Sequence, residues 1–302
     1  YKLIGGPHAT LRAEKLKGEH LVVKGEAEDV FLDVLKNPRE GIINAGEIEN
    51  LDKLPFIDRT LFSNDPYEID DKLEAALNTS RGCPYSCVFC SVPVINGRRV
   101  RERSIKNVLG EIHLLQEKGV NSLHFTDDLF NFNRKRLEAF CDALIEENNG
   151  MAWRDLSRVE LLDDALLEKM RTSGCYNLAF GLESGVPKIL EYIGKHTDLN
   201  KARKVVKKCS ELGIETKGFF TIGYPDETED DIKRTIDFAH ELGLTQTYFM
   251  VVRAFPGTRL YNELREQFSE EELEDYYQSQ SNDSYVKYHV MNSQSLNGIS
   301  NK

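Results

Sequence analysis

Short apolar runs alternate with longer amphipathic stretches along most of this chain. The apolar runs predict β-strands at residues 2–4, 20–23, 76–79, 122–125, 151–156, 177–181, 216–222 and 246–252. In the stretches between them, apolar residues recur at helical spacing, as at Val108, Ile112 and Leu115. Repeated strand–helix units are typical of a parallel sheet with right-handed crossovers, so the pattern predicts an α/β fold.

Residues 49–75 interrupt this alternation. They contain Pro55, Pro66 and many acidic residues, a composition typical of a linker. This linker would separate two strand–helix units in residues 1–48 from six in residues 76–268. Residues 269–302 are first acidic and then polar, and we interpret them as an incomplete C-terminal extension. Because the chain begins with Tyr1 inside an apolar run, we expect its natural N-terminus to lie upstream.

Charge and cysteine usage narrow the classes of function. The 302 residues include 50 acidic and 39 basic side chains, and the net charge of −11 disfavours binding to nucleic acid. No apolar run has the roughly 18–20 residues of a membrane span. Residues 97–106 carry four arginines and a lysine, which fit either an anion site or a solvated loop that enters a helix. Six cysteines, three of them within eight residues, form a poor disulfide pattern, so we expect a cytoplasmic protein with reduced thiols.

The three clustered cysteines follow the first strand of the larger unit. Cys83, Cys87 and Cys90 form a C-x3-C-x2-C pattern, whose short gaps let three thiolates converge on one inorganic core. Three ligands leave one iron of a [4Fe–4S] cluster without a protein ligand, and an open metal position is a catalytic feature. Zinc is the alternative, although zinc sites usually pair two C-x2-C units and this sequence has no second one.

The triplet, with Phe89 just before the third cysteine, resembles the signature of the radical S-adenosylmethionine superfamily. Four further segments match that family in the expected order: 125–130, 181–185, 218–223 with Glu227, and 255–258. This resemblance implies a (β/α)6 partial TIM barrel, with its chemistry at the C-terminal ends of the strands.

The resemblance also implies the cofactors. A [4Fe–4S] cluster would reduce bound S-adenosylmethionine, which then breaks into methionine and a 5′-deoxyadenosyl radical. Because that radical attacks C–H bonds indiscriminately, the barrel would have to exclude water and fix a small-molecule substrate. The electron would come from an external one-electron donor such as flavodoxin or ferredoxin, under anaerobic conditions.

Acidic residues at two strand ends are candidates for binding S-adenosylmethionine. Asp127 and Asp128 follow the second strand of the larger unit, where a carboxylate can accept hydrogen bonds from the methionine amino group. We expect one of the two to point inward and prefer Asp128; the alternative is a helix N-cap. The resemblance further implies that Glu183, with Ser184 beside it, lies against the ribose or the methionyl group.

Two cations and a glycine-bearing segment complete the candidates. Lys195 resembles the family's cation for the methionine carboxylate, and Arg158, after the third strand, is its rival because its fork suits a bidentate grip. The segment between Gly218 and Gly223 would allow a close backbone approach to adenine; otherwise it is a buried strand with a tight exit turn. We expect structural roles for the three scattered cysteines, Cys141, Cys175 and Cys209.

Residues 1–48 resemble the end of a cobalamin-binding domain, a doubly wound, Rossmann-like domain that precedes the radical domain in one large subgroup. The matching pieces are residues 2–10, with Gly5 and Gly6, and residues 22–28. Both pieces also fit plain strand-to-helix turns. The upstream strands of such a domain are absent, and no Asp-x-His-x-x-Gly ligand motif occurs. We therefore expect cobalamin in the full-length parent rather than in this fragment.

The leading hypothesis is a cobalamin-associated radical S-adenosylmethionine enzyme. The resemblance implies methyl transfer to an unactivated carbon, or an oxidative cyclisation or rearrangement. A methylthiotransferase is an alternative, but it would need a second cysteine set and a nucleic-acid-binding tail, and neither is visible. The non-enzymatic alternative is an interaction module that holds zinc or a cluster.

Overall fold

The computed structural model describes residues 2–18, 20–62, 66–69, 72–148 and 150–278. They divide into two compact units. One unit, which we call the loop unit because it contains the clustered cysteines, is built on residues 1–55, 80–103 and 253–273. The other, the barrel unit, is built on residues 56–79 and 104–252. The domain boundaries expected from the sequence at residues 48, 75 and 268 stay a prediction.

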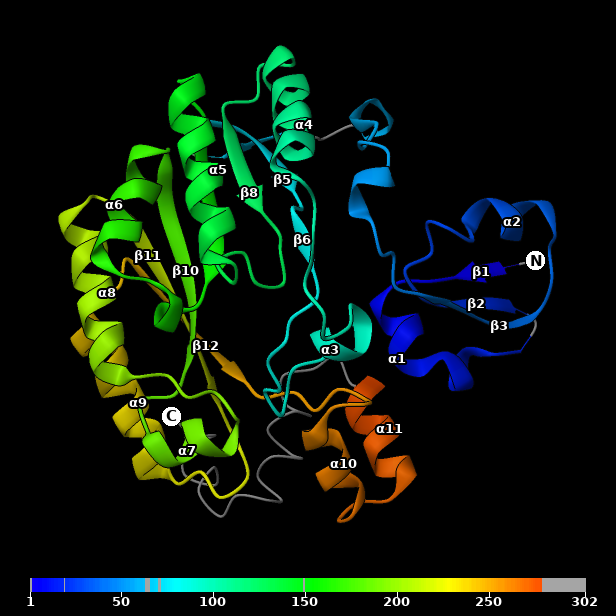
Figure 1. The fold of residues 1–302 in the computed structure, drawn as a ribbon. Helices are drawn as coiled ribbons and strands as arrows, with labels where there is room; N and C mark the ends of the chain where they lie inside the picture. Colours follow the sequence, from blue (N-terminus) through cyan, green and yellow to red (C-terminus); the bar gives the residue numbers. More distant parts are fainter. Residues whose placement is uncertain (1, 19, 63–65, 70–71, 149, 279–302) are drawn as a thin grey trace. The chain divides into compact units, whose positions relative to one another are not determined.

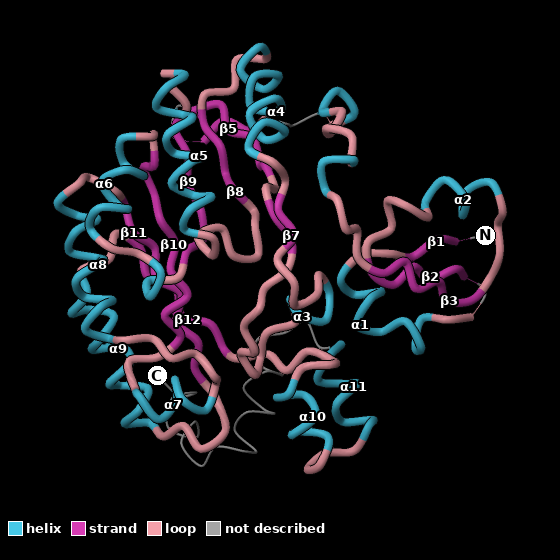
Figure 2. Tube along the Cα trace, in the orientation of Figure 1, coloured by secondary structure: helices cyan, strands magenta, loops and turns pink. Residues whose placement is uncertain are grey.

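Seven strands form the sheet of the barrel unit, in the order β12-β11-β10-β9-β8-β5-β4 (Figures 1 and 2). Neighbours from β5 to β12 pair in parallel, while β4 pairs antiparallel with β5. Six parallel strands joined by helical crossovers confirm the α/β class and the partial (β/α)6 barrel. The strands are β4 Tyr67–Ile69, β5 Lys72–Leu77, β8 Ser122–Phe125, β9 Ala152–Ser157, β10 Cys175–Glu183, β11 Glu215–Ile222 and β12 Gln246–Val251.

A layer of helices covers one face of this sheet (Figure 1). Successive helices of the layer contact one another in the order α4, α5, α6, α8 and α9. The main hydrophobic core lies between helices and sheet, where the ring of Trp153 lies 5.7 Å from Phe125 and 5.6 Å from Phe130. Dense packing of this kind fixes the strand ends. The bounds are α4 Ile105–Glu117, α5 Arg134–Glu147, α6 Asp164–Thr172, α7 Pro187–Tyr192, α8 Leu199–Glu211 and α9 Glu229–Leu242, with 3₁₀ turns η2 Arg59–Leu61 and η3 Val159–Leu161.

The opposite face of the sheet carries a polar cluster. Because successive strand residues point to opposite faces, Arg154 lies on the face opposite Trp153. Arg154 donates two hydrogen bonds of 2.8 and 2.6 Å to the carboxylate of Glu74, and the Tyr176 hydroxyl donates a third at 3.1 Å. This cluster connects β5, β9 and β10 on that face.

The loop unit contains a second, smaller parallel sheet, in the order β1-β2-β3. Helix α1 packs on β2, and Ala9, Ala13 and Val22 form a small core there. Strands β6 and β7 make a separate antiparallel pair. The bounds are β1 Lys2–Ile4, α1 Pro7–Leu16, β2 His20–Gly25, α2 Phe31–Lys36, β3 Gly41–Gly46, η1 Leu51–Lys53, β6 Ser80–Arg81, α3 Val92–Ile95, β7 Arg101–Glu102 and α10 Arg259–Arg265; helix α11 follows at Glu270–Gln278.

The segment 49–75 is more structured than its composition suggests. It contains η1, η2, β4 and the first residues of β5, whereas the sequence predicted a linker and a strand at 76–79. One of its charged residues is buried and has partners outside the segment: Arg59 donates to the carbonyl oxygen of Ala76 and lies 3.8 Å from Glu111 of α4. Composition alone does not reveal such pairing. Within the described residues, no helix is long and apolar enough to cross a membrane.

Candidate functional site

The three clustered cysteines lie in the loop unit, on the segment between β6 and β7. These short strands pair with Arg81 opposite Arg101, which brings the two ends of the segment together. We call residues 82–100 the cysteine loop. Its three thiols, which belong to Cys83, Cys87 and Cys90, form no disulfide in the described structure and are partly buried.

Close backbone contacts hold the base of the cysteine loop closed. The N–H of Cys83 donates to the carbonyl oxygen of Gly97 at 3.2 Å. Gly82 has a φ of +95°, and a Cβ at that position would lie 2.2 Å from the carbonyl oxygen of Arg99. Only glycine meets both conditions without displacing the backbone.

A second segment packs against the middle of the cysteine loop. The N–H of Leu260, at the start of α10, donates to the carbonyl oxygen of Val88 at 3.0 Å. A Cβ on Gly257 would lie 3.1 Å from the Val94 side chain. The motif at 255–258 therefore supports the cysteine loop within the loop unit. Val88 directly precedes Phe89, which is partly buried.

The other three cysteines differ chemically from the clustered three. Burial raises the pKa of Cys141 and of Cys209 to about 12, and raises that of Cys175 well above its ordinary value. These thiols are held protonated in the packed interior, as expected for structural cysteines. The partly exposed thiols are those of the loop.

The cysteine loop fits an iron–sulfur cluster by its donor chemistry. Three thiolates from one short loop are the ligands that such clusters take. Among the described residues, no three His, Cys, Asp or Glu side chains are already gathered as a metal site.

Two arginines of the basic segment 97–106 contact other side chains of the loop unit. Arg98 donates to the Ser86 hydroxyl, and Arg99 forms an ion pair with Glu49. Helix α4 then begins behind Ser104, whose hydroxyl accepts the N–H of Asn107 at 3.1 Å. The segment is thus a loop that enters a helix, in which the exposed Arg98 and Arg99 contact neighbouring side chains.

Asp127, at the end of β8 in the barrel unit, fixes the end of β5. Its carboxylate accepts the N–H and the hydroxyl of Thr79, each at 2.6 Å, and its side chain is buried. Asp128 is only partly buried. Neither residue caps a helix: α5 begins at Arg134 and is capped by Asn133. The N-cap alternative is therefore wrong, while the ligand role of Asp128 stays a prediction.

Glu183 and Lys195 come together at the end of β10. The Nζ of Lys195 lies 2.9 Å from Oε1 of Glu183, and the Thr221 hydroxyl donates to Oε2 at 2.8 Å. Glu183 has a φ of +64°, and a Cβ on Gly181 would lie 2.7 Å from both charged groups. The sequence pointed to both charged residues but not to their pairing, and it did not single out Thr221.

Arg158 is held by a residue that the sequence analysis did not single out. The side chain of Asn131, which is fully buried, accepts the N–H of Arg158 at 3.1 Å and donates to its carbonyl oxygen at 2.9 Å. The guanidinium of Arg158 donates to Glu160 at 3.1 Å. Asn131 follows the 125–130 motif directly, which is the one signal in the sequence that marks it.

The remaining candidates of the barrel unit have structural contacts. The Ser184 hydroxyl lies 3.0 Å from that of Thr235 and accepts the N–H of Val186 at 3.1 Å. A Cβ on Gly218 would lie 2.4 Å from Leu244, so glycine is required there for packing. These contacts favour the buried-strand alternative for Gly218.

The exit turn after β11 contains a buried acid. Gly223 has a φ of +90°, and its N–H donates to Glu227 at 2.5 Å, with a second bond of 3.2 Å from the N–H of Tyr224. Burial raises the pKa of Glu227 to about 7, although these two N–H groups act in the opposite direction. The turn is held by Glu227 as well as by the glycine.

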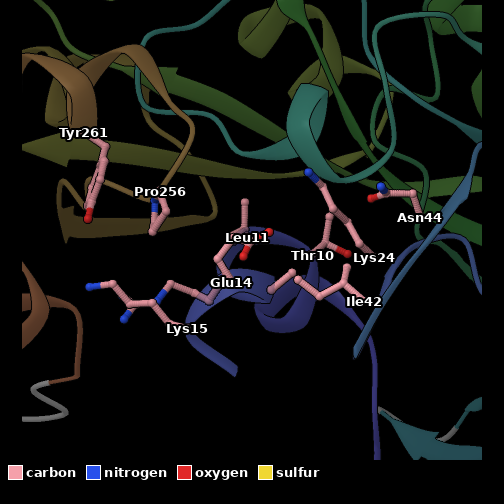
Figure 3. A pocket seen from close by; sticks show the side chains of 11 residues that line it. Thr10, Leu11, Glu14, Lys15, Lys24, Ile42, Asn44, Pro256 and Tyr261 are labelled. Carbon is pink, nitrogen blue, oxygen red and sulfur yellow. The ribbon is translucent and has the colours of Figure 1, made fainter. Parts of the chain in front are cut away.

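The loop unit also has a cavity of about 410 Å³ beside α1 (Figure 3). Three cations, an acid and several apolar side chains line it, and the labelled residues come from α1, β2, β3 and the segment around α10. Gly5 and Gly6, at the turn before α1, are not among the lining residues. The lining is Thr10, Leu11, Arg12, Ala13, Glu14, Lys15, Lys24, Ile42, Asn44, Pro256 and Tyr261.

Comparison with known sequences identifies a family match and several relatives. Residues 77–239 match the profile described as the Radical SAM superfamily. An uncharacterized methyltransferase of Pyrococcus horikoshii is 33% identical over 86% of this chain and 62% of its own length. Bacteriochlorophyllide d C-12(1)-methyltransferase of Chlorobaculum tepidum is 26% identical over 87% of this chain and 60% of its own. The anaerobic magnesium-protoporphyrin IX monomethyl ester cyclase of Rubrivivax gelatinosus is 26% identical over 91% and 55%. The chain thus spans less than two thirds of these relatives.

Solved structures share the fold at low sequence identity. The radical S-adenosylmethionine methyltransferase TsrM from Kitasatospora setae, with cobalamin and a [4Fe–4S] cluster bound, has a TM-score of 0.61 at 24% identity, over 65% of this chain and 37% of that chain. Methylornithine synthase PylB has a TM-score of 0.51 at 16% identity, over 72% and 60%. These likenesses support the partial barrel.

Proposed function

Because the chain belongs to the radical SAM superfamily, we propose that it is the core of a radical S-adenosylmethionine enzyme. Cys83, Cys87 and Cys90 would hold a [4Fe–4S] cluster, whose open iron position takes S-adenosylmethionine. The cluster, when bound, supplies the electron that splits S-adenosylmethionine into methionine and a 5′-deoxyadenosyl radical. The reaction would be methyl transfer to, or oxidative cyclisation or rearrangement of, a small molecule at an unactivated carbon.

The observation that carries this proposal is the contrast between the two sets of cysteines. The clustered thiols are partly exposed on one loop whose base is closed by β6 and β7. The remaining three are buried, with pKa values raised by burial. A thiolate must be deprotonated and reachable to bind iron, so the chemistry belongs to the loop.

In the barrel unit we propose that Asp128 accepts hydrogen bonds from the methionine amino group. Both candidate cations for the methionine carboxylate have an acidic partner, Glu160 for Arg158 and Glu183 for Lys195. We propose Arg158, because its planar fork suits a bidentate carboxylate contact and has further N–H donors. Glu183 would then face the ribose or methionyl group, with its carboxylate held in place by hydrogen bonds from Lys195 and Thr221. Ser184 and Gly218 support the same strand ends through packing.

Cobalamin is proposed for the full-length parent. The likeness to TsrM and the methyltransferase relatives support this assignment. The 410 Å³ cavity in the loop unit lies at the small end of the range of about 300–1,000 Å³ that suits drug-sized ligands, and a corrin with its nucleotide tail is larger. A cytoplasmic location and a flavodoxin or ferredoxin as electron donor belong to the same proposal.

The alternatives make different demands on the cysteines. A methylthiotransferase needs a second reactive set, whereas the other three cysteines lie buried in the barrel unit. A zinc-holding interaction module needs a fourth ligand beside the three thiolates.

Metal analysis separates these functions. The purified protein is reconstituted with iron and sulfide without oxygen, and bound iron, sulfide and zinc are measured. We expect about four irons per chain, lost when Cys83, Cys87 or Cys90 is replaced by Ala and kept in Cys209→Ala. One zinc per chain in a colourless protein would contradict the proposal.

A further inference from the structure

The two strands that close the cysteine loop place two arginines opposite each other. Arg81 of β6 and Arg101 of β7 form a directly opposed cross-strand pair. Like charges at opposed positions destabilise a strand pair. The closure of the loop therefore depends on a group that neutralises both cations.

Glu26, which follows β2, is that group. Its Oε2 accepts hydrogen bonds from Arg81 at 3.0 Å and from Arg101 at 2.9 Å, and its Oε1 accepts a second bond from Arg101 at 2.5 Å. The N–H of Ile48 donates to the same carboxylate at 2.9 Å. One carboxylate thus joins both ends of the cysteine loop to the parallel sheet of the loop unit.

Because Glu26 and Arg101 are buried, replacement of either one would leave the other as a buried charge without its main partner. Glu26 is 7% exposed and Arg101 is 4% exposed. Arg101 also donates to the carbonyl oxygens of Asn96, inside the cysteine loop, and of Ile48. Burial raises the pKa of Glu26, but the hydrogen bonds and charges of its partners bring it below the ordinary value. The carboxylate is therefore charged at neutral pH.

Glu28 contacts the same arginine from the surface. It accepts a hydrogen bond of 2.7 Å from Arg81, but its side chain is 41% exposed. Exposed ion pairs contribute little to stability. The buried hydrogen bonds of Glu26, rather than the exposed contact of Glu28, therefore hold the cysteine loop closed.

We propose that Glu26 is a positioning residue for the iron–sulfur cluster: by bridging Arg81 and Arg101 it holds the cysteine loop closed, so that its three thiolates reach one cluster. This inference rests on the proposed function of the loop. Glu26 acts through the two arginines and touches neither the cluster nor the substrate. Partners that orient ligands in this way change metal affinity by about 10–100-fold when they are replaced.

The test compares two buried carboxylates with the same kind of partner. Glu26→Gln removes the bridging charge, and Glu74→Gln removes the charge of the Arg154-bound carboxylate in the barrel unit. Both variants are expected to unfold at lower temperature than the wild type. After anaerobic reconstitution, loss of the cluster to an iron chelator should be about 10-fold faster in Glu26→Gln than in Glu74→Gln. Equal loss rates in the two variants would overturn the proposal.

A milder variant covers the case in which Glu26→Gln does not fold. Arg81→Met keeps a side chain of similar length but removes the hydrogen bonds to both Glu26 and Glu28. It should lose the cluster faster than the wild type, whereas Glu28→Gln, which removes only the exposed partner, should behave as the wild type. A wild-type rate in Arg81→Met would count against the bridge.

A readout on the cluster-free protein separates this inference from the proposed function. The alkylation rates of Cys83, Cys87 and Cys90 are followed by mass spectrometry in the native state. Opening of the loop should raise these rates several-fold in Glu26→Gln and leave them unchanged in Glu74→Gln. A wild-type protein that binds no iron would refute the proposed function alone; unchanged alkylation in Glu26→Gln would refute the bridge.

Discussion

The carboxylate of Glu183 and the ammonium of Lys195 form a buried ion pair, with 2.9 Å between Oε1 and Nζ. They are brought together because the chain turns after β10 and returns past α7. Replacement of one partner leaves the other as a buried, unpaired charge, which typically costs about 3–5 kcal/mol.

Lys195→Met should therefore lower the free energy of unfolding by about 3 kcal/mol or more. The double variant Glu183→Gln/Lys195→Met should lose less than the sum of the two single losses, because neither charge is left alone. Urea unfolding of the four proteins completes the cycle. Strict additivity would mean that the two groups do not interact.

Asp127 and Asp128 should respond differently to substitution. Asp127→Ala leaves the buried N–H and hydroxyl of Thr79 without their acceptor, which we expect to cost about 1–3 kcal/mol. Asp128→Ala should cost less stability and instead raise the KM for S-adenosylmethionine. Thermal unfolding and a titration with S-adenosylmethionine measure the two effects. The same KM in Asp128→Ala and the wild type would show that Asp128 is not the amino-group ligand.

Asp155 on β9 should make stability depend on pH. Burial raises its pKa from 3.8 to about 8, against a smaller opposite effect of the Ser157 hydroxyl, with the charge of Asp127 adding to the rise. Between these two values the folded state holds a proton that the unfolded state releases. The contribution of Asp155 is thus full below pH 3.8 and is lost as pH rises through about 8.

Asp155→Asn removes this dependence. The slope of the unfolding free energy against pH should become less negative by up to about 1.4 kcal/mol per pH unit within that window. The control is Asp237→Asn, which changes an exposed carboxyl on α9. Urea unfolding at a series of pH values gives the slopes, and parallel curves for Asp155→Asn and the wild type would argue against a neutral Asp155.

Gly82 and Gly41 offer a matched pair of substitutions in the loop unit. Both have a positive φ, +95° and +110°, but a Cβ would collide with the carbonyl oxygen of Arg99 only at Gly82; at Gly41 nothing lies within 4 Å. Gly82→Ala should therefore reduce iron binding, while Gly41→Ala should cost only backbone strain of order 1–3 kcal/mol. Iron content after reconstitution, with circular dichroism as a check on folding, decides between them. Similar iron contents would contradict the close approach at Gly82.

The periodic pattern of the sequence predicted the strands well. Each of the eight expected strands overlaps an observed strand, but β3, β4, β6 and β7 were not predicted, so residues 1–48 contain three strands instead of the expected two. The strand ends were less well predicted: β5 spans Lys72–Leu77, whereas the sequence predicted a strand at residues 76–79. A local sequence pattern therefore predicts that a strand is present more reliably than it predicts the residues at which the strand begins and ends.

Pairing between distant residues was not predictable. Glu26 and Arg101 lie 75 positions apart, and no spacing rule in one sequence connects them. Alternation at the end of β8 predicted that one of Asp127 and Asp128 points inward, with Asp128 preferred; the structure buries Asp127, which is bonded to Thr79. The motifs named candidate residues, and the packing determines what each of them contacts.

Radical chemistry at the cysteine loop is the activity that we propose for this chain. The most direct measurement is the formation of 5′-deoxyadenosine after anaerobic reconstitution, reduction with dithionite and addition of S-adenosylmethionine, assayed by mass spectrometry. We expect product in the wild type and in Cys209→Ala, and none in Cys83→Ala, Cys87→Ala or Cys90→Ala. Product formation that persists in all three loop variants would contradict it.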